Sequence, residues 1–172
     1  MTHPAADTFI PLINQHLGIA HKVCRIYFAD AADYEDVLQE MLYQLWRSYP
    51  AFDQRAKFST WMYSVCLNTA LTYRRKQQKH KSEALSFTHQ QIAAPAAENK
   101  NEVISLLFEA IATLSPVNKA IVLLYLEDMS YEEIADITGL TRSNVSVRLV
   151  RLKRELETIL KQKIKSIDNV NL

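Results

Sequence analysis

The sequence predicts an all-α protein of two small helical domains joined by a flexible linker. Turn-forming residues are rare, with two glycines and five prolines in 172 residues, whereas a sheet protein needs frequent turns. Apolar residues recur every three or four positions over long stretches, which is the helical period. The polar segment 80–101 lacks this periodicity and contains Pro95 and an alanine-rich patch. We therefore expect a domain at 1–79, a linker at 80–101 and a domain at 102–172.

Composition argues against several classes of protein and site. No apolar run approaches the roughly 20 residues that span a bilayer, and the N-terminus lacks the charged and apolar regions of a signal peptide. We expect a cytoplasmic protein without membrane insertion. Cys24 and Cys66 lack a Cys-x-x-Cys motif, which favours reduced core thiols over a disulfide or a metal site. His16 and His21 fall on different helix faces, so no metal or cofactor is predicted.

The net charge of +1 hides a strong segregation of charge along the chain. Residues 26–46 contain five acidic side chains and no Lys or Arg, whereas residues 54–82 contain seven basic side chains and no acid. A second acidic block at 127–136 precedes a second basic block at 142–165. Such blocks can arise by chance on a solvated surface. Their repetition favours two nucleic-acid faces, with acidic faces left for another partner.

Two helices are expected in the first half of the N-terminal domain. The first runs from Phe9 to Ala29, with Pro11 in its first turn, where a missing amide costs little. The second runs from Asp33 to Tyr49 and ends before Pro50. Its apolar stripe consists of Val37, Met41, Leu42, Leu45 and Tyr49.

The polar side of the second helix carries Asp33, Asp36, Gln39, Glu40 and Tyr43. This side is either a solvated face or a docking site for a basic protein. Asp36 and Glu40 lie one turn apart, which is the arrangement that an acid/base pair of an enzyme would have. No nucleophile, metal ligand or Gly-rich loop accompanies them, so we do not predict an enzyme.

The third helix begins after a loop at 51–57 that contains Phe52. Ser59 or Thr60 is expected to cap it, and Met62, Val65, Cys66 and Thr69 to be buried. The other side carries aromatic and amide groups and then a basic run: Trp61, Tyr63, Asn68, Tyr73, Arg74, Arg75, Lys76 and Lys79. Aromatic rings alone favour a core. Rings followed by basic side chains favour a platform for single-stranded nucleic acid, because rings stack on unpaired nucleobases while Lys and Arg follow the phosphates.

The C-terminal domain is expected to begin near Glu102, with an apolar stripe of Ile104, Leu107, Phe108, Ile111 and Leu114. A new helix should start at Ser115-Pro116, a cap followed by proline at the first helical position.

The segment from Ser130 to Arg154 predicts a helix-turn-helix. Ser130 and Glu133 form a capping-box pattern, Gly139 suits the turn, and Thr141 can cap the second helix. The buried stripe of that helix is Val145, Leu149, Leu152, Leu156 and Leu160. Its opposite side carries Arg142, Ser143, Asn144, Ser146, Val147, Val150 and Arg151, mostly types that reach base edges or phosphates. The two valines contact either thymine methyl groups or other protein side chains.

These motifs together resemble the bacterial sigma-70 family of RNA polymerase sigma factors, in its extracytoplasmic-function (ECF) group. The resemblance is carried by Asp33-x-x-Asp36-x-x-Gln39-Glu40 with Trp46, by Phe58-x-Thr60-Trp61 with Asn68 and the basic run, and by Ser130-Tyr131-Glu132-Glu133-Ile134-Ala135 with Gly139, Val145 and Arg148-Leu149. It covers nearly the whole chain.

The resemblance implies a transcription initiation factor without catalytic activity, whose partners are core RNA polymerase and promoter DNA, with an anti-sigma factor as a further candidate partner. The residues implied for contact with the β′ clamp helices are those of the polar side of the second helix: Asp33, Asp36, Gln39, Glu40 and Tyr43. The residues implied for the −10 element are Phe52, Arg55, Lys57, Trp61, Asn68, Tyr73, Arg74, Arg75 and Lys76. Those implied for the −35 element are Arg142, Ser143, Asn144, Ser146, Val147, Arg148 and Arg151.

One departure from the family pattern concerns the −35 element. Many relatives have Lys or Arg and then Ser where this chain has Ser146-Val147, so a typical −35 sequence is not expected. Two alternatives stay open: a helix-turn-helix regulator that never joins polymerase, and, less favoured, an enzyme acting on nucleic acid.

Overall fold

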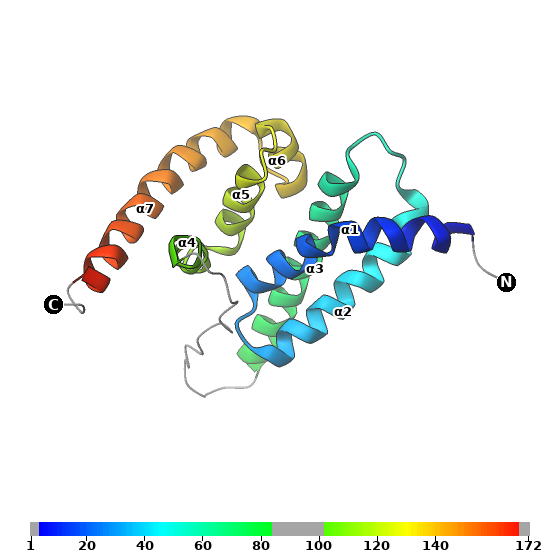
Figure 1. Ribbon diagram of the computed structural model, residues 1–172, viewed down its shortest axis with the longest axis horizontal. Helices are drawn as coiled ribbons and strands as arrows, with labels where there is room; N and C mark the ends of the chain where they lie inside the picture. The colour runs from blue at the N-terminus through cyan, green and yellow to red at the C-terminus, as the bar shows by residue number, and fades with distance from the viewer. Residues whose placement is uncertain (1–3, 84–101, 169–172) are drawn as a thin grey trace. The chain divides into compact units, whose positions relative to one another are not determined.

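The computed structural model describes residues 4–83 and 102–168, and every regular element in these ranges is helical (Figure 1). The chain divides into two compact units, one within residues 1–95 and the other within 96–172. The all-α prediction is confirmed. The third helix continues to Glu83, past the expected boundary at 79, and residues 84–101 of the expected linker lie outside the described ranges. None of the described helices is both long enough and apolar enough to cross a membrane.

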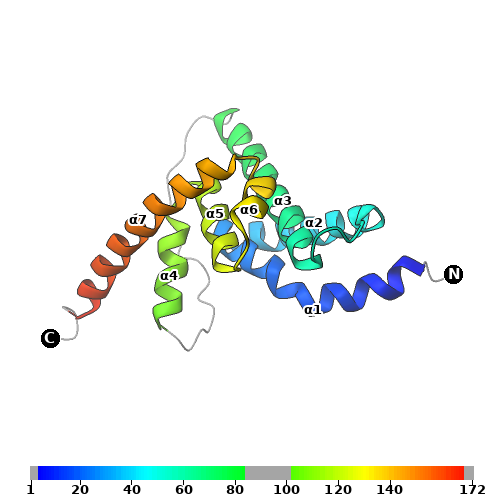
Figure 2. The ribbon, with the colours of Figure 1, turned by 90° about the horizontal axis from the view of Figure 1, so that it is seen from above.

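The N-terminal unit is a bundle of three helices, α1 (Pro4–Tyr27), α2 (Ala31–Ser48) and α3 (Phe58–Glu83), with a 3₁₀ turn at Tyr49–Ala51. Each helix packs against the other two, as Figures 1 and 2 show. The centre of the bundle is filled by fully buried side chains from all three helices, among them Val23, Cys24, Val37, Met41, Leu45, Met62, Tyr63, Cys66 and Leu67.

The expected start of the first helix is wrong. Helix α1 begins at Pro4, so Pro11 lies inside it rather than in its first turn. An interior proline removes one helical hydrogen bond and costs about 3 kcal/mol. Phe9 and Ile13 are buried on either side of Pro11, whose own ring is exposed. Burial of these two apolar side chains offsets part of the cost.

Capping explains where α2 begins. Asp30 is its N-cap, and Oδ1 of Asp30 accepts hydrogen bonds from the amides of Ala32 (2.9 Å) and Asp33 (3.2 Å). Helix α2 therefore starts two residues before the expected position. In its expected stripe Val37, Met41 and Leu45 are buried, whereas Leu42 and Tyr49 are half-buried.

Two expectations for α3 are wrong. The helix begins at Phe58, so Ser59 and Thr60 lie in its first turn and neither is the N-cap. Tyr63, expected on the exposed side, is 1% exposed, while Val65 and Thr69, expected in the core, are half-buried. The physical reason is that α3 packs against two helices, which widens its buried arc beyond a single amphipathic stripe.

The C-terminal unit contains α4 (Glu102–Ala112), α5 (Pro116–Leu126), α6 (Tyr131–Thr138) and α7 (Arg142–Asp168). Helix α7 packs against α4, α5 and α6. Pro116 occupies the first position of α5 as expected, although the Ser115 side chain makes no capping hydrogen bond. Ile104, expected in the stripe of α4, is instead 42% exposed.

The turn between α6 and α7 has the expected geometry of a helix-turn-helix. The capping box is complete, because Ser130 Oγ accepts from the Glu133 amide (3.2 Å) and Glu133 Oε2 accepts from the Ser130 amide (2.9 Å). Gly139 ends α6 at φ +71°, a left-handed conformation that suits glycine. Thr141 Oγ1 accepts from the Asn144 amide at 3.2 Å, which confirms the cap of α7.

Polar links hold the long helix α7 to its neighbours. Lys163 Nζ lies 2.8 Å from Glu109 Oε2 of α4, and Lys153 Nζ donates to the Tyr125 hydroxyl of α5 at 2.8 Å. The apolar residues Val145, Leu149, Leu152 and Leu156 of α7 are buried as expected, and Leu160 is half-buried. These contacts fix the rotation of α7 about its own axis, so that its opposite side faces solvent.

Candidate functional site

The polar side of α2 is largely exposed. Asp36, Gln39, Glu40 and Tyr43 all face solvent. Asp33 differs from them, because it is half-buried and its Oδ1 accepts a hydrogen bond from Gln77 Nε2 of α3 at 2.8 Å. The structure thus gives Asp33 a role in joining α2 to α3. The four exposed side chains form what we call the α2 face.

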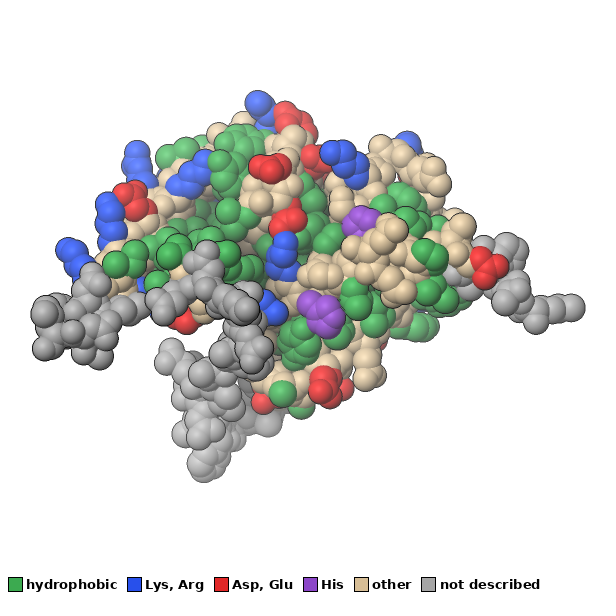
Figure 3. Space-filling view, in the orientation of Figure 1, with side chains coloured by type: hydrophobic (Ala, Val, Ile, Leu, Met, Phe, Trp, Pro, Cys, Tyr) green, Lys and Arg blue, Asp and Glu red, His purple; other side chains and the backbone are tan. Residues whose placement is uncertain are grey.

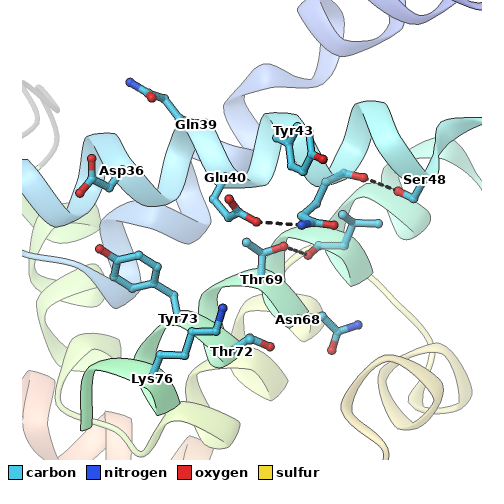
Figure 4. A pocket seen from close by; sticks show the side chains of 12 residues that line it. Asp36, Gln39, Glu40, Tyr43, Ser48, Asn68, Thr69, Thr72, Tyr73 and Lys76 are labelled. Atoms are coloured by element: carbon cyan, nitrogen blue, oxygen red, sulfur yellow. Dashed lines mark hydrogen bonds between the residues drawn. The ribbon is translucent and has the colours of Figure 1, made fainter. Parts of the chain in front are cut away.

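A groove of about 870 Å³ runs between α2 and α3 (Figure 4). It brings together residues that sequence reasoning assigned to two different partners. Its walls are Asp36, Gln39, Glu40, Tyr43, Gln44 and Ser48 from α2 and Val65, Asn68, Thr69, Thr72, Tyr73 and Lys76 from α3. Helix α2 supplies the acidic groups of the groove, and Lys76 of α3 supplies its cation.

Hydrogen bonds order part of this lining, as the dashed lines in Figure 4 show. Gln44 Nε2 donates to Glu40 Oε1 at 2.8 Å, and Ser48 Oγ donates to the Gln44 carbonyl at 2.6 Å. Sequence reasoning missed Gln44, Ser48 and Thr72 as lining residues. Gln44 follows Glu40 by four residues and Ser48 follows Gln44 by four, while Thr72 follows Asn68 by four and Thr69 by three, spacings that would have placed them on the same side.

Six aromatic side chains surround the start of the loop at 51–57. The Phe52 and Trp61 rings lie 5.0 Å apart, and those of Phe58 and Trp61 5.3 Å apart. Tyr49, Phe9 and Trp46 continue the cluster through ring pairs at 5.0 to 6.5 Å. Phe52 and Trp61 are half-buried, so each ring is held by the fold while part of it remains accessible.

The rest of the loop is polar and exposed. Gln54 adopts a left-handed conformation at φ +60°. Asp53 accepts a hydrogen bond from the Arg55 amide at 3.2 Å and pairs with the Arg55 guanidinium. The pKa of the Asp53 carboxyl is lowered, most strongly by the hydrogen bond from the Arg55 amide and next by the hydrogen bond from the Arg55 guanidinium. Lys57 is exposed just before α3.

The basic run on α3 divides into cations with different surroundings. Arg74 is half-buried, and its Nη1 donates to the backbone carbonyl of Tyr27, the last residue of α1, at 2.8 Å. Arg75 and Lys76 are exposed, as is Asn68. Tyr73 is half-buried, and its ring meets Phe28 edge-on at 5.5 Å. Arg75 and Lys76 therefore suit phosphate contacts better than Arg74.

The solvent side of α7 is the second candidate surface. Arg142, Ser143, Asn144, Val147, Arg148, Val150 and Arg151 are exposed, whereas Ser146 is half-buried. We call these exposed residues the reading face. Lys and Arg side chains are spaced along α7 (Figure 3).

Two arginines of the reading face are tied to neighbouring helices. The Arg142 guanidinium pairs with Glu132 of α6, and Arg148 Nη1 donates to Asn118 Oδ1 of α5 at 3.1 Å. A hollow of about 350 Å³ beside them is lined by Asn118, Asn144, Val147, Arg148, Arg151, Leu152 and Glu155. Sequence reasoning missed Asn118, because only folding brings α5 to this face. Glu155 follows Arg151 by one helical turn, a spacing that would have revealed it.

No group of three metal-binding side chains occurs within the described part of the chain. His16 Nδ1 lies 2.9 Å from the Leu12 carbonyl, and His21 Nδ1 lies 2.6 Å from the Tyr34 hydroxyl, so both histidines have packing roles. Cys24 and Cys66 are buried free thiols, as expected. Burial raises the pKa of each thiol to about 12, which makes them unreactive at neutral pH.

Comparison with known proteins decides the family. Residues 12–80 match the family model of sigma-70 region 2, and residues 104–156 match that of sigma-70 region 4. The ECF RNA polymerase sigma-E factor of Haemophilus influenzae is 30% identical over 144 residues, with 73% of this chain and 73% of that protein covered.

The chain belongs to the ECF group of the sigma-70 family. The ECF RNA polymerase sigma factor SigW of Bacillus subtilis is 23% identical over 169 residues, covering 90% of each chain. Sigma factors as a class are non-enzymatic transcription initiation factors. Sigma factors bind RNA polymerase and promoter DNA.

Two solved structures share the fold of this ECF sigma factor at 20% sequence identity. The sigma factor RpoE of Bartonella quintana, crystallised with the anti-sigma factor NepR, gives a TM-score of 0.74 and covers 90% of this chain and 97% of that one. CnrH, in complex with the cytosolic domain of CnrY, gives a TM-score of 0.61 and covers 91% of this chain and 90% of that one.

Proposed function

We propose that this ECF sigma factor docks on core RNA polymerase through the α2 face and directs the enzyme to promoters, reading melted −10 DNA with its N-terminal unit and −35 duplex with its C-terminal unit. One observation carries the proposal. The segments that match sigma-70 regions 2 and 4 each present an exposed surface with the chemistry that its partner requires.

Docking on polymerase rests on the charge of the α2 face. Asp36 and Glu40 are exposed carboxylates one turn apart, with the Gln39 amide beside them. Exposed charges of this kind steer association and select partners rather than supply most of the affinity. A basic surface on the β′ clamp helices would complement them.

This docking role has a direct test with a matched control. The variant Asp36→Ala/Glu40→Ala should bind core polymerase at least tenfold more weakly, measured by fluorescence anisotropy of the labelled full-length chain. Glu35→Ala removes an exposed carboxylate of α2 that lies outside the groove and should change binding less than twofold. Equal losses in the two variants would reduce the effect to net charge and remove the docking assignment.

Reading of the −10 element rests on the aromatic cluster and the exposed groups of α3. Extruding a base costs a few kcal/mol, and stacking on an aromatic ring returns about 1–3 kcal/mol per base. The Phe52 and Trp61 rings are already held by their neighbours, so little side-chain entropy is lost when a base stacks on them. Asn68 offers hydrogen bonds to a base, and Arg55, Lys57, Arg75 and Lys76 offer phosphate contacts.

Reading of the −35 element rests on α7. The second helix of a helix-turn-helix enters the major groove with its N-terminal residues at the base edges. Ser143, Asn144 and Arg151 are exposed in this part of α7 and can hydrogen-bond to base edges. Arg142 and Arg148 would contact phosphates or bases only by leaving Glu132 and Asn118.

Run-off transcription with purified core polymerase tests the function as a whole. Core enzyme with the full-length chain should start transcripts at discrete genomic sites, and core enzyme alone should not. If no promoter-specific transcript forms from any genomic fragment while the chain still binds DNA, the regulator that never joins polymerase becomes the better description. The family assignment does not favour that alternative.

An anti-sigma factor is the further partner that we propose, because the sigma factor RpoE of similar fold was crystallised with the anti-sigma factor NepR. A protein co-purifying with the full-length chain from its native cells should inhibit the run-off reaction when added in equimolar amount. Co-purifying proteins that leave transcription unchanged would argue against this regulation.

A further inference from the structure

Two valines stand at the centre of the reading face. Val147 and Val150 are each 52% exposed, although every other valine or leucine of α7 between residues 145 and 156 is buried. The two lie one helical turn apart on the same side of α7. Internal packing, one of the two roles that sequence reasoning left open, therefore accounts for only about half of each side chain's surface.

The polar groups around these valines are partly committed to the protein. The Arg142 guanidinium pairs with Glu132, and Arg148 donates to Asn118 at 3.1 Å. Val147 also borders the hollow whose other walls include Asn144 and Arg151. An apolar contact surface thus lies beside an exposed cation, Arg151, and amide groups that suit DNA.

The major groove offers one prominent apolar feature, the C5 methyl group of thymine. An arginine or lysine at these positions would favour guanine, whose N7 and O6 accept hydrogen bonds. A valine provides no donor and gains only by excluding water from another apolar group. The chemistry that fits Val147 and Val150 is therefore duplex DNA with thymine in the groove.

We propose that Val147 and Val150 read thymine methyl groups in the −35 element. The inference rests on the proposed function, since it specifies how α7 selects a −35 sequence. Three residues advance about 4.5 Å along a helix, and base pairs are stacked about 3.4 Å apart, so the two valines contact different base pairs. Thymine is expected at one position for each valine.

Replacing thymine by uracil tests this contact, because the substitution removes the methyl group and nothing else. The full-length chain bound to core polymerase is first used to select duplexes from a library randomised across the −35 region. Each thymine of the preferred duplex is then replaced by uracil in turn. Binding should weaken about fourfold at each contacted position, which is equivalent to about 0.8 kcal/mol for the loss of one buried methyl group.

Protein variants assign each position to a side chain. Val147→Ala should abolish the uracil effect at one position, and Val150→Ala at another. Val147→Thr keeps the shape of the side chain with one methyl group fewer and should reduce the effect at the first position. Ile164→Ala removes an aliphatic side chain that is 46% exposed near the other end of α7, and it should leave all uracil effects unchanged. Circular dichroism checks that each variant is folded.

The outcomes separate this inference from the function on which it rests. If no preferred duplex emerges from the selection, the proposed reading of a −35 element fails. If a preferred duplex emerges but uracil weakens binding at none of its thymines, methyl recognition is refuted. Uracil effects that persist undiminished in both valine-to-alanine variants would assign the methyl contact to other residues and overturn the inference.

Discussion

Replacing Arg74 by Ala should destabilise the N-terminal unit, whereas replacing its neighbour Arg75 should not. Arg74 donates at 2.8 Å to the carbonyl of Tyr27, which ends α1. Hydrogen bonds from charged donors contribute about 1.5–3 kcal/mol, and a cation at a helix C-terminus adds about 0.3–1 kcal/mol. Because Arg74 is half-buried, water replaces part of this interaction. We expect a loss of about 1–2 kcal/mol for Arg74→Ala.

Tryptophan fluorescence isolates this effect, because both tryptophans, Trp46 and Trp61, lie in the N-terminal unit. Urea unfolding of the full-length chain should show a lower midpoint for Arg74→Ala with an unchanged slope. Arg75→Ala removes the same charge from an exposed position and should stay within about 0.5 kcal/mol of wild type. Equal midpoints for the two variants would refute the reasoning and return Arg74 to the phosphate-binding role implied by the family.

Three more changes have defined outcomes. Gly139→Ala should lower the stability of the C-terminal unit by about 1–2 kcal/mol, because alanine is strained at φ +71°. Gly18→Ala, in open space within α1, should instead stabilise the N-terminal unit by up to about 1 kcal/mol. Thermal melts followed by circular dichroism and tryptophan fluorescence compare the two variants, and a stability change of the same sign in both would contradict the backbone argument. Asp30→Ala removes the N-cap of α2 and should lower the stability of the N-terminal unit, followed by tryptophan fluorescence, by about 1 kcal/mol. An unchanged urea midpoint would rule out a stabilising role for this cap. Between pH 9 and 12 the folded chain keeps the protons of Cys24 and Cys66, whose pKa values burial raises from 9.0 to about 12, while the unfolded chain loses them. Stability contributed by the buried thiols should therefore fall as pH rises above 9, by about 1.4 kcal/mol per thiol per pH unit, and a Cys24→Ala/Cys66→Ala variant with the same pH slope as wild type would disprove it.

The helix-turn-helix is the part of the fold that local sequence determined most completely. Ser130, Glu133, Gly139 and Thr141 act within a few residues of their own positions, so their patterns predicted the observed caps and turn. The exposed acids of α2 and the cations of α3 were also evident, because amphipathic spacing separates polar from apolar residues before any packing is known.

Long-range contacts decided what local patterns left open. Tyr63 is buried because α3 packs against two helices, and Arg74 and Asp33 are engaged because residues 47 and 44 positions away meet them. The same holds for Asn118, which lies 30 positions from Arg148 in the chain and beside it in the fold. Sequence alone thus determined the helical class, the caps and turn of the helix-turn-helix, and the charge of each surface. Only tertiary structure decided which of those charged and aromatic side chains remain available to a partner, since that depends on neighbours that local spacing does not specify.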